Sequence, residues 1–249
     1  MTGRIADGAR GLPSLPKELL QRSFLDYAVH VSTNHRFIYV INPKVACSSI
    51  LWTLRRLENR DADSVPGKVG VIHDRSDSPL ARPSDLKASV ELLEDDGYFR
   101  FTFVRNPFDR LLSCYLNKIV RPTVQRGLAH RAAGRKGESD DLMPIDEFVE
   151  VIAKQSIVEM DPHWRPQWAQ TLQGVARFDA IGRFEDFDRE LSRIGESISP
   201  EFARYVYREE RQATGPKPYH LLTDETADRI REIYRDDFHA FDYSLEVPG

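Results

Sequence analysis

Apolar and polar positions alternate along the chain in blocks that predict strands and helices in turn. The run Phe37 to Ile41 is continuously aromatic or β-branched, which is typical of a strand buried on both faces of a parallel sheet. After a turn, apolar residues recur at helical spacing and predict a helix from about Ser48 to Glu58. Its core-facing residues are Ile50, Leu51, Leu54 and Leu57. This segment therefore predicts a strand, a loop and a helix in succession.

The same unit recurs twice. Phe99 to Val104 predicts a second buried strand, followed at Pro107 by the start of an amphipathic helix. A third apolar run, Phe178 to Phe184, precedes another amphipathic segment. The core-facing residues of these two helices are Leu111, Leu112, Tyr115 and Ile119, and then Phe187, Leu191 and Ile194. This alternation predicts a single-domain α/β fold with a central parallel sheet flanked by helices.

Two stretches depart from the alternation. Val120 to Asp141 is rich in Arg, Lys, Gly and Ser, which predicts a mobile basic loop, able to act as a lid, before the helix that Pro144 opens. Near the C-terminus, Thr223 is expected to cap a helix whose first turn is acidic. The core-facing residues of that helix are Ile230, Ile233, Tyr234 and Phe238.

Length and charge narrow the classes of protein to consider. A chain of 249 residues suits one sizeable core, and we expect an N-terminal extension over residues 1–30 and one domain over residues 31–249. The formal net charge of −4 argues against a general binder of nucleic acid or anionic membrane. Any anion site must therefore be local.

The cysteine count and the apolar runs bear on the compartment. Cys47 and Cys114 are too few for a disulfide framework or a zinc-ligand set, so we expect reduced thiols and no metal site. Met1 to Leu20 holds no apolar run of signal-peptide length, and no later segment approaches a membrane span. We expect a soluble, cytoplasmic protein without a transmembrane segment.

The loop Asn42 to Ser49 is the first candidate site. It joins a buried strand to a helix N-terminus, where backbone N–H groups and the helix dipole favour an anion. Lys44 adds a movable charge, and Ser48 adds a hydroxyl beside small residues. A Walker A loop has glycine at both ends and lysine just before Ser or Thr, which is not the pattern here. The loop indicates either a phosphate site of another type or a plain turn with an exposed lysine.

The second strand and helix unit offers a similar arrangement. Arg105 ends the strand, and Ser113 follows about two turns into the helix. Pro107 fixes the turn between them, so both side chains can face one phosphate. In the alternative interpretation, Arg105 pairs with Asp109 and Ser113 only packs.

These segments resemble the nucleotide-binding motifs of a known family. Pro43 to Ser49 and Phe103 to Tyr115 are similar to the two motifs with which the carbohydrate sulfotransferases of sulfotransferase family 2 bind 3′-phosphoadenosine 5′-phosphosulfate (PAPS). The resemblance spans residues 37–243 and implies the P-loop-like central sheet of the sulfotransferase fold. It continues through His163 to Pro166, Asp179 to Glu185, Ile233 to Phe238 and Phe241 to Tyr243.

The chain departs from that family at two points. Ser48 stands where the family usually has Thr, a change that keeps the hydroxyl. The membrane anchor of the Golgi-resident animal members is missing from this sequence. The resemblance thus implies the family's chemistry in a different compartment.

The resemblance implies roles for both loops. The stretch expected to hold the 5′-phosphosulfate is Lys44, Val45, Ala46, Cys47, Ser48 and Ser49. Lys44 is expected to neutralise charge on the oxygen between phosphate and sulfate as that bond breaks. Arg105 and Ser113 are expected to hold the 3′-phosphate. Arg211 and Gly215 resemble a late loop that covers it, although an exposed arginine before a turn is the alternative.

A general base is needed for the acceptor hydroxyl, and histidine suits the role. His73 follows a stretch, Val69 to Ile72, that is expected to be β and to end at the ligand edge of the sheet. His163 belongs to a segment shared with the family. The alternatives are an acidic base such as Glu185 and purely structural histidines.

The favoured interpretation is a PAPS-dependent sulfotransferase that transfers a sulfuryl group to a hydroxyl of a carbohydrate or related acceptor. It releases 3′-phosphoadenosine 5′-phosphate (PAP) and needs no metal. The alternatives are a P-loop-type phosphotransferase that uses ATP and magnesium, and a catalytically silent nucleotide-binding module. The basic residues of the 120–141 loop either attract an anionic glycan or are simply solvated. They are Arg126, Arg131, Arg135 and Lys136. The acceptor and the oligomeric state stay open at this point.

Overall fold

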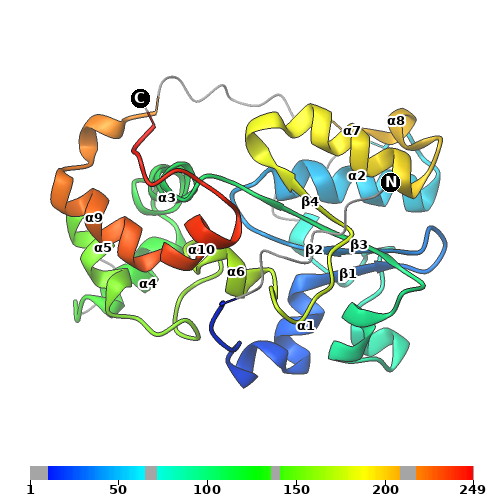
Figure 1. Ribbon diagram of the computed structural model, residues 1–249, viewed down its shortest axis with the longest axis horizontal. Helices are drawn as coiled ribbons and strands as arrows, with labels where there is room; N and C mark the ends of the chain where they lie inside the picture. The colour runs from blue at the N-terminus through cyan, green and yellow to red at the C-terminus, as the bar shows by residue number, and fades with distance from the viewer. Residues whose placement is uncertain (1–10, 65–71, 136–140, 208–216, 249) are drawn as a thin grey trace.

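The computed structural model describes residues 11–64, 72–135, 141–207 and 217–248. Its centre is one four-stranded sheet with the strand order β1-β2-β3-β4 (Figure 1). The strands are β1 Val29–Ser32, β2 Phe37–Val40, β3 Phe99–Val104 and β4 Ala180–Arg183. β1 pairs antiparallel with β2, and the pairs β2–β3 and β3–β4 are parallel. The predicted α/β fold is confirmed, and the predicted parallel arrangement holds for β2, β3 and β4, whereas β1 adds an antiparallel edge strand that was not predicted.

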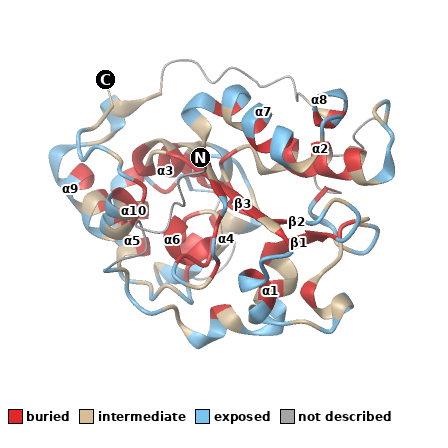
Figure 2. Ribbon diagram, turned by 45° about the vertical axis from the view of Figure 1, so that its right-hand side comes forward, coloured by how far each residue is buried: buried red, intermediate tan, exposed pale blue. Residues whose placement is uncertain are grey.

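The parallel register brings the ends of three strands to one edge of the sheet. Tyr39 is the partner of Phe101, and Val104 is the partner of Arg183. The loops that follow β2, β3 and β4 therefore leave the sheet side by side, which is where ligands bind in open α/β sheets. Every residue of β1 and β2 is buried (Figure 2). The continuous apolar run from Phe37 predicts this for β2, whereas β1 buries the polar side chains of His30 and Ser32 and was not predicted.

Helices cover both faces of the sheet. Figure 1 shows α2 (Cys47–Asn59), α7 (Phe187–Ile198) and α8 (Phe202–Tyr205) on one side and α1 (Arg22–Ala28) on the other. α7 packs against β3 and β4, and α1 packs against β1. The part of the structure around the sheet also contains short 3-10 helices: η1 Lys17–Leu20, η3 Pro83–Leu86, η4 Val90–Glu94 and η6 Phe184–Asp186. Leu19 and Leu25 belong to the same buried core, so part of the segment expected as an extension packs on the sheet.

A second group of helices forms its own apolar cluster beside the sheet (Figure 1). Its members are α3 Pro107–Cys114, the π-helix η5 Tyr115–Ile119, α4 Val124–Ala132, α5 Ile145–Ala153, η7 Tyr219–Leu221, α9 Asp224–Ile233 and α10 Arg235–Ala240. The short helix α6 (Gln167–Gln170) joins this group to the sheet. The buried carboxylate of Asp237 accepts hydrogen bonds from the backbone N–H groups of Gln167 at 2.7 Å and Trp168 at 2.8 Å. These bonds fix the helical group against the sheet edge.

The prediction of a basic loop over Val120 to Asp141 is wrong for its central part. The segment forms α4, and the Thr123 side chain caps it by accepting a hydrogen bond from the N–H of Arg126. His130 is fully buried, and its Nε2 lies 3.1 Å from the carbonyl oxygen of Asp141. The cap and these buried contacts outweigh the Gly and Arg content that indicated a loop. Lys136 lies outside the described residues.

Two further predictions, the strand before His73 and the single C-terminal helix, differ from the structure. Val69 to Val71 lie outside the described residues, and Ile72 lies in a 3-10 turn rather than in a strand. The predicted C-terminal helix is capped by Thr223 as expected, but it breaks at Tyr234 into α9 and α10. Across the part of the chain that the structure describes, no helix is long and apolar enough to cross a membrane.

Candidate active site

The loop between β2 and α2 has an unusual backbone. Lys44 and Ala46 both adopt positive φ angles, of 73° and 62°. The left-handed region costs a residue with a side chain roughly 1–2 kcal/mol, and such strain concentrates at functional sites. Ala46 is the N-cap of α2, and no side chain caps this helix end. The first N–H groups of a helix of 13 residues are therefore available to an anion.

A cavity of about 480 Å³ lies directly at this loop. Lys44 and Ser48 contribute from the loop and the start of α2, while His73 and His163 contribute from distant parts of the chain. Ala46 and Cys47 also line it. The structure thus brings together the predicted lysine, one predicted serine and both predicted histidines. No aspartate or glutamate among the described residues lines this cavity.

Three predicted residues of the first loop serve different purposes. Val45 and Ser49 are buried away from the cavity, and the carbonyl oxygen of Ser49 accepts a hydrogen bond from Thr53 Oγ1 at 2.9 Å. Burial raises the pKa of the Cys47 thiol, so the thiol stays protonated. At Val45 and Ser49, only the backbone can act on a ligand, whereas Cys47 contributes a neutral thiol to the cavity wall.

Lys44 is partly buried between the two loops. Burial lowers the pKa of its ammonium group. Its carbonyl oxygen accepts a hydrogen bond from Arg105 Nη1 at 3.2 Å. The first and second predicted loops are therefore physically connected.

His73 lies beside the start of α2, with Nε2 3.3 Å from the Ser48 hydroxyl oxygen. Its pKa is lowered to about 4, chiefly because burial disfavours the imidazolium and further because of the nearby positive charge of His163 when it is protonated and of Lys118. The ring is neutral at pH 7, and its tendency to accept a proton is weak.

His163 has a partner that the sequence analysis did not consider. Its Nδ1 lies 2.7 Å from Asp161 Oδ1, which also accepts the backbone N–H of His163 at 2.9 Å. Burial alone raises the pKa of Asp161, but the hydrogen bonds from His163 outweigh it and lower that pKa. Burial lowers the pKa of His163, while Asp161 opposes this effect. With Nδ1 donating to a carboxylate, Nε2 is the nitrogen left to accept a proton.

The second loop centres on Arg105, which is 7% exposed. Its guanidinium carbon lies 4.2 Å from the centre of the Phe184 ring. Its Nε is buried and has no hydrogen-bond partner among the described residues. A buried guanidinium N–H without an acceptor is costly, so this atom is a candidate contact for an anionic ligand.

Asp109 is the partner of Arg105 in the alternative interpretation of the sequence, and the two side chains do lie close together. One of its oxygens lies 4.0 Å from Arg105 Nε and 2.9 Å from Lys217 Nζ. The Tyr219 hydroxyl donates to the same carboxylate. Lys217 and Tyr219 were not singled out in the sequence, and they extend the positive and polar surroundings of this loop.

The remaining predicted site residues either lie away from the cavity or fall outside the described residues. Ser113 is half-buried on α3, one helical turn beyond Asp109, and does not line the cavity. Arg211 and Gly215 lie outside the described residues. Glu185 accepts hydrogen bonds from the N–H of Asn106 at 2.7 Å and the Tyr243 hydroxyl at 3.0 Å, so it supports the second loop rather than the cavity.

Gln167 is a positioning residue that sequence reasoning missed. Its Oε1 accepts hydrogen bonds from the N–H of Arg105 and from Asn42 Nδ2, both at 3.0 Å. Its Nε2 donates to the carbonyl oxygen of Arg105 at 2.8 Å. A single buried amide therefore holds the ends of β2 and β3 in register. No feature of the local sequence indicates this contact, because the partners lie far apart along the chain.

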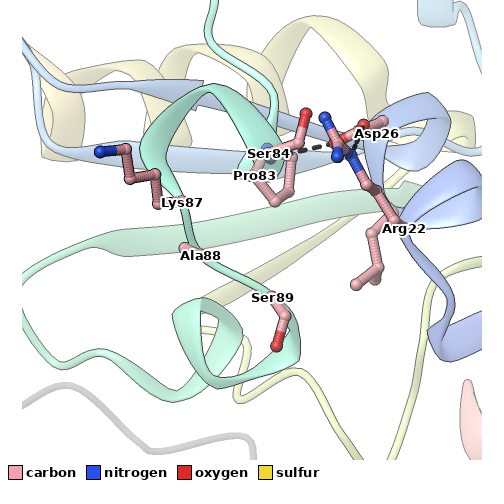
Figure 3. A pocket seen from close by; sticks show the side chains of 8 residues that line it. Arg22, Asp26, Pro83, Ser84, Lys87, Ala88 and Ser89 are labelled. Atoms are coloured by element: carbon pink, nitrogen blue, oxygen red, sulfur yellow. Dashed lines mark hydrogen bonds and ion pairs between the residues drawn. The ribbon is translucent and has the colours of Figure 1, made fainter.

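A second hollow of about 330 Å³ lies between α1 and η3 (Figure 3). Its carboxylate, Asp26, accepts the N–H of Ser84 at 3.1 Å and pairs with Arg22 at 3.4 Å. The Asp26 carboxylate thus satisfies an N–H group at the start of η3, and no predicted site residue lines this hollow. Within the described ranges, no group of three or more His, Cys, Asp or Glu side chains is arranged to hold a metal ion.

Comparison with known proteins extends over most of the chain. A family model described as "Sulfotransferase family" matches residues 27–244. Carbohydrate sulfotransferase 14 of Homo sapiens is 29% identical over 259 aligned residues, which cover 98% of this chain and 68% of that protein. The Danio rerio protein of the same name is 31% identical, with 98% and 70% covered. Carbohydrate sulfotransferase 11 of Rattus norvegicus is 23% identical, with 86% and 66% covered. No solved structure gives a significant match.

Proposed function

We propose, on the premise that this chain belongs to the sulfotransferase family, that it transfers a sulfuryl group from PAPS to a hydroxyl of a carbohydrate or a related acceptor. The chain is a sulfotransferase enzyme by its family; the donor and the acceptor are the proposal. The relatives are named carbohydrate sulfotransferases, which supports a saccharide acceptor. The observation that carries the proposal is the cavity in which Lys44 and the uncapped start of α2 meet two histidines.

The residues present fit a donor with two separate anionic groups. The N–H groups at the start of α2, the Ser48 hydroxyl and Lys44 suit the 5′-phosphosulfate. Arg105, whose buried Nε lacks an acceptor among the described residues, suits the 3′-phosphate. Ser113 on α3 remains the second proposed contact at that end. PAPS supplies the sulfuryl group when it is bound.

Lys44 is the proposed electrostatic catalyst. Its ammonium group stabilises the negative charge that builds on the oxygen from which the sulfuryl group departs. Partial burial lowers its pKa and strengthens its interaction with an anion, because the local dielectric is lower than that of water. The hydrogen bond from Arg105 to the Lys44 carbonyl holds this loop in place.

His163 is the proposed general base. Its Nδ1 is fixed by Asp161, so Nε2 can receive the proton of the acceptor hydroxyl, and Asp161 stabilises the imidazolium that results. His73, first among the sequence candidates, has a pKa of about 4 and is the weaker base. Its contact with Ser48 suits it to position the start of α2 instead.

The alternatives differ in the ligand that they predict. A P-loop-type phosphotransferase is disfavoured by the glycine-free loop, and it predicts stronger protection by ATP and magnesium than by PAP. A catalytically silent module predicts PAP binding without turnover of any hydroxyl compound.

Thermal unfolding with PAP, with ATP and magnesium, and with neither tests the donor. At a concentration of about 100 times Kd, PAP stabilises the native protein by roughly 2.7 kcal/mol. Arg105→Ala removes a charged hydrogen-bond donor worth about 1.5–3 kcal/mol, so the PAP-induced shift of this variant shrinks when compared with its own ligand-free Tm. Absence of a PAP shift, or a larger shift with ATP and magnesium, refutes the proposed donor.

A further inference from the structure

Arg110 is a buried cation on α3 to which the proposed function assigns no role. Its side chain is 2% exposed. In the described part of the chain, three backbone carbonyl oxygens rather than a carboxylate accept hydrogen bonds from its guanidinium group. Because a buried charge is costly to keep, the backbone segments that this group joins indicate its purpose.

The three hydrogen bonds join two separate loops. Arg110 Nε donates to the carbonyl oxygen of Pro43 at 3.0 Å. Nη1 donates to that of Arg165 at 2.8 Å, and Nη2 donates to that of Pro162 at 3.0 Å. A guanidinium is planar and presents its N–H groups in a rigid fork. The carbonyl groups of the two loops are therefore held at fixed positions relative to each other.

Two of these carbonyl groups directly precede the residues of the proposed mechanism. The Pro43 carbonyl belongs to the peptide group that leads into Lys44, and the Pro162 carbonyl belongs to the one that leads into His163. Lys44 and His163 both line the cavity. One rigid group thus holds the backbone before the proposed electrostatic catalyst and before the proposed base.

The backbone of Lys44 is held on both sides by arginines of the second loop and its helix. Arg110 binds the peptide group before Lys44, and Arg105 Nη1 donates to the Lys44 carbonyl oxygen at 3.2 Å. Lys44 has a φ angle of 73°, in the left-handed region that is unfavourable for a residue with a side chain. Without the bond from Arg110, we expect this segment to relax and the ammonium group to move.

Arg110 itself stands on a rigid first turn of helix. Asn106 caps α3, because its side chain accepts the N–H groups of Phe108 at 3.0 Å and Asp109 at 3.4 Å. The N–H of Arg110 donates to the Asn106 carbonyl oxygen at 2.8 Å, and Pro107 fixes the first helical position. The guanidinium group is therefore presented from a fixed support.

We propose that Arg110 is a positioning residue that sets the separation and orientation of Lys44 and His163 across the cavity. This inference rests on the proposed function, in which Lys44 acts on the departing oxygen and His163 on the attacking hydroxyl. An in-line transfer places these two oxygens on opposite sides of the sulfur atom, so both side chains must be aligned at once. A misplacement of about 1 Å lowers the rate of such a reaction by about 100-fold.

The first test replaces the fork by a point charge. Arg110→Lys keeps the positive charge and most of the buried chain, but it cannot bind three carbonyl groups at once. PAP titration counts the binding-competent sites, and turnover is expressed per site. We expect kcat per site to fall about 100-fold, while PAP affinity changes by less than about threefold, because Lys44 acts mainly in the transition state. A purely structural role lowers the number of sites and leaves kcat per site unchanged.

A matched control is the buried arginine at the other end of β3. Arg100 is 3% exposed, and its Nε pairs with Asp179 at 3.0 Å, near the strand end that lies away from the cavity. Arg100→Lys is expected to lower Tm and the number of PAP-binding sites but to keep the wild-type kcat per site. This control separates the loss of a buried guanidinium from the loss of alignment.

The second test restores the fork without the covalent bond. Arg110→Ala is assayed with ethylguanidine and, at equal concentration, with ethylammonium. Ethylguanidine is expected to raise kcat per site, whereas ethylammonium is not, because only the guanidinium matches the three carbonyl groups. Arg110→Lys still tests the inference if Arg110→Ala does not fold.

Three outcomes overturn the inference. A wild-type kcat per site in Arg110→Lys removes the positioning role. A loss of PAP affinity as large as the loss of kcat assigns Arg110 to donor binding. Equal rescue by the two small cations shows that charge rather than alignment matters. Failure of the proposed function itself is distinguishable, because the wild type then shows neither stabilisation by PAP nor transfer from PAPS.

Discussion

Replacement of Asp161 by Asn removes the carboxylate that orients His163 and keeps the turn that the two residues share. Asp161 Oδ1 accepts both Nδ1 and the backbone N–H of His163, at 2.7 and 2.9 Å. The amide oxygen of Asn can still accept the backbone N–H, so the local fold is retained. What Asn cannot provide is the negative charge that holds the proton on Nδ1 and stabilises the imidazolium.

The magnitude follows from the lost charge-assisted hydrogen bond. A hydrogen bond to a charged group contributes about 1.5–3 kcal/mol, and about 1.4 kcal/mol corresponds to a tenfold change in rate. We therefore expect kcat of Asp161→Asn to fall roughly 10- to 100-fold, with PAP affinity unchanged. Because Asp161 raises the pKa of His163 against the effect of burial, its loss lowers that pKa further. The acid limb of kcat/KM then moves to lower pH, since the base is neutral over a wider acidic range.

The assay is steady-state turnover of PAPS with a fixed acceptor, measured as a function of pH for the wild type and Asp161→Asn. The lower kcat and the shift of the acid limb of kcat/KM must occur together in Asp161→Asn. If Asp161 had a purely structural role, kcat would fall without a shift of the acid limb. A variant with wild-type kcat and a wild-type limb refutes the assignment of His163 as base and of Asp161 as its positioning residue.

Two other predictions concern the donor loop and the sheet. Lys44→Ala is expected to lower kcat about 100- to 1,000-fold. The affinity for PAP is expected to change much less, because the main contact of Lys44 forms in the transition state. Equal losses in turnover assays and in PAP titrations contradict this role. Gly182→Ala places a methyl group 2.5 Å from Phe103 Cε1 in the core and is expected to destabilise the protein by about 1–3 kcal/mol in urea denaturation. Gly127→Ala, at a half-buried position of α4 where the nearest neighbour of the added methyl group is at 3.5 Å, is the control and is expected to gain about 0.5–1 kcal/mol. Equal midpoints for the two variants contradict the packing argument.

The three parallel strands of the sheet could be predicted because their signals are local, whereas β1, which contains His30 and Ser32, was not predicted. The run that predicts the strand Phe99 to Val104 coincides with β3, and the run from Phe37 contains β2. Continuous aromatic and β-branched runs have few alternatives to a strand buried on both faces. The helix α4 was missed because its stability comes from the Thr123 cap and from burial of Ala129 and His130 against neighbouring helices. A composition rich in Arg and Gly gives no indication of that packing.

The site was predictable only where one segment carries the chemistry. Lys44 and Ser48 follow from the position of a loop before a helix N-terminus, and the cavity at that loop includes both. The pairing of Asp161 with His163 has a sequence signal, because Asp accepts N–H groups two residues onward. The presence of Lys118 in the cavity depends on the π-turn after α3, and no periodicity argument predicts a change of helical hydrogen bonding there.

The most direct test of the account is the transfer reaction itself. The wild-type protein and Lys44→Ala are incubated with PAPS and a panel of neutral and anionic oligosaccharides, and both PAP release and sulfated product are quantified by mass spectrometry. The account predicts sulfated saccharide in amounts equal to the PAP released, formed by the wild type and strongly reduced in Lys44→Ala. PAP binding without any sulfated product across the panel contradicts it.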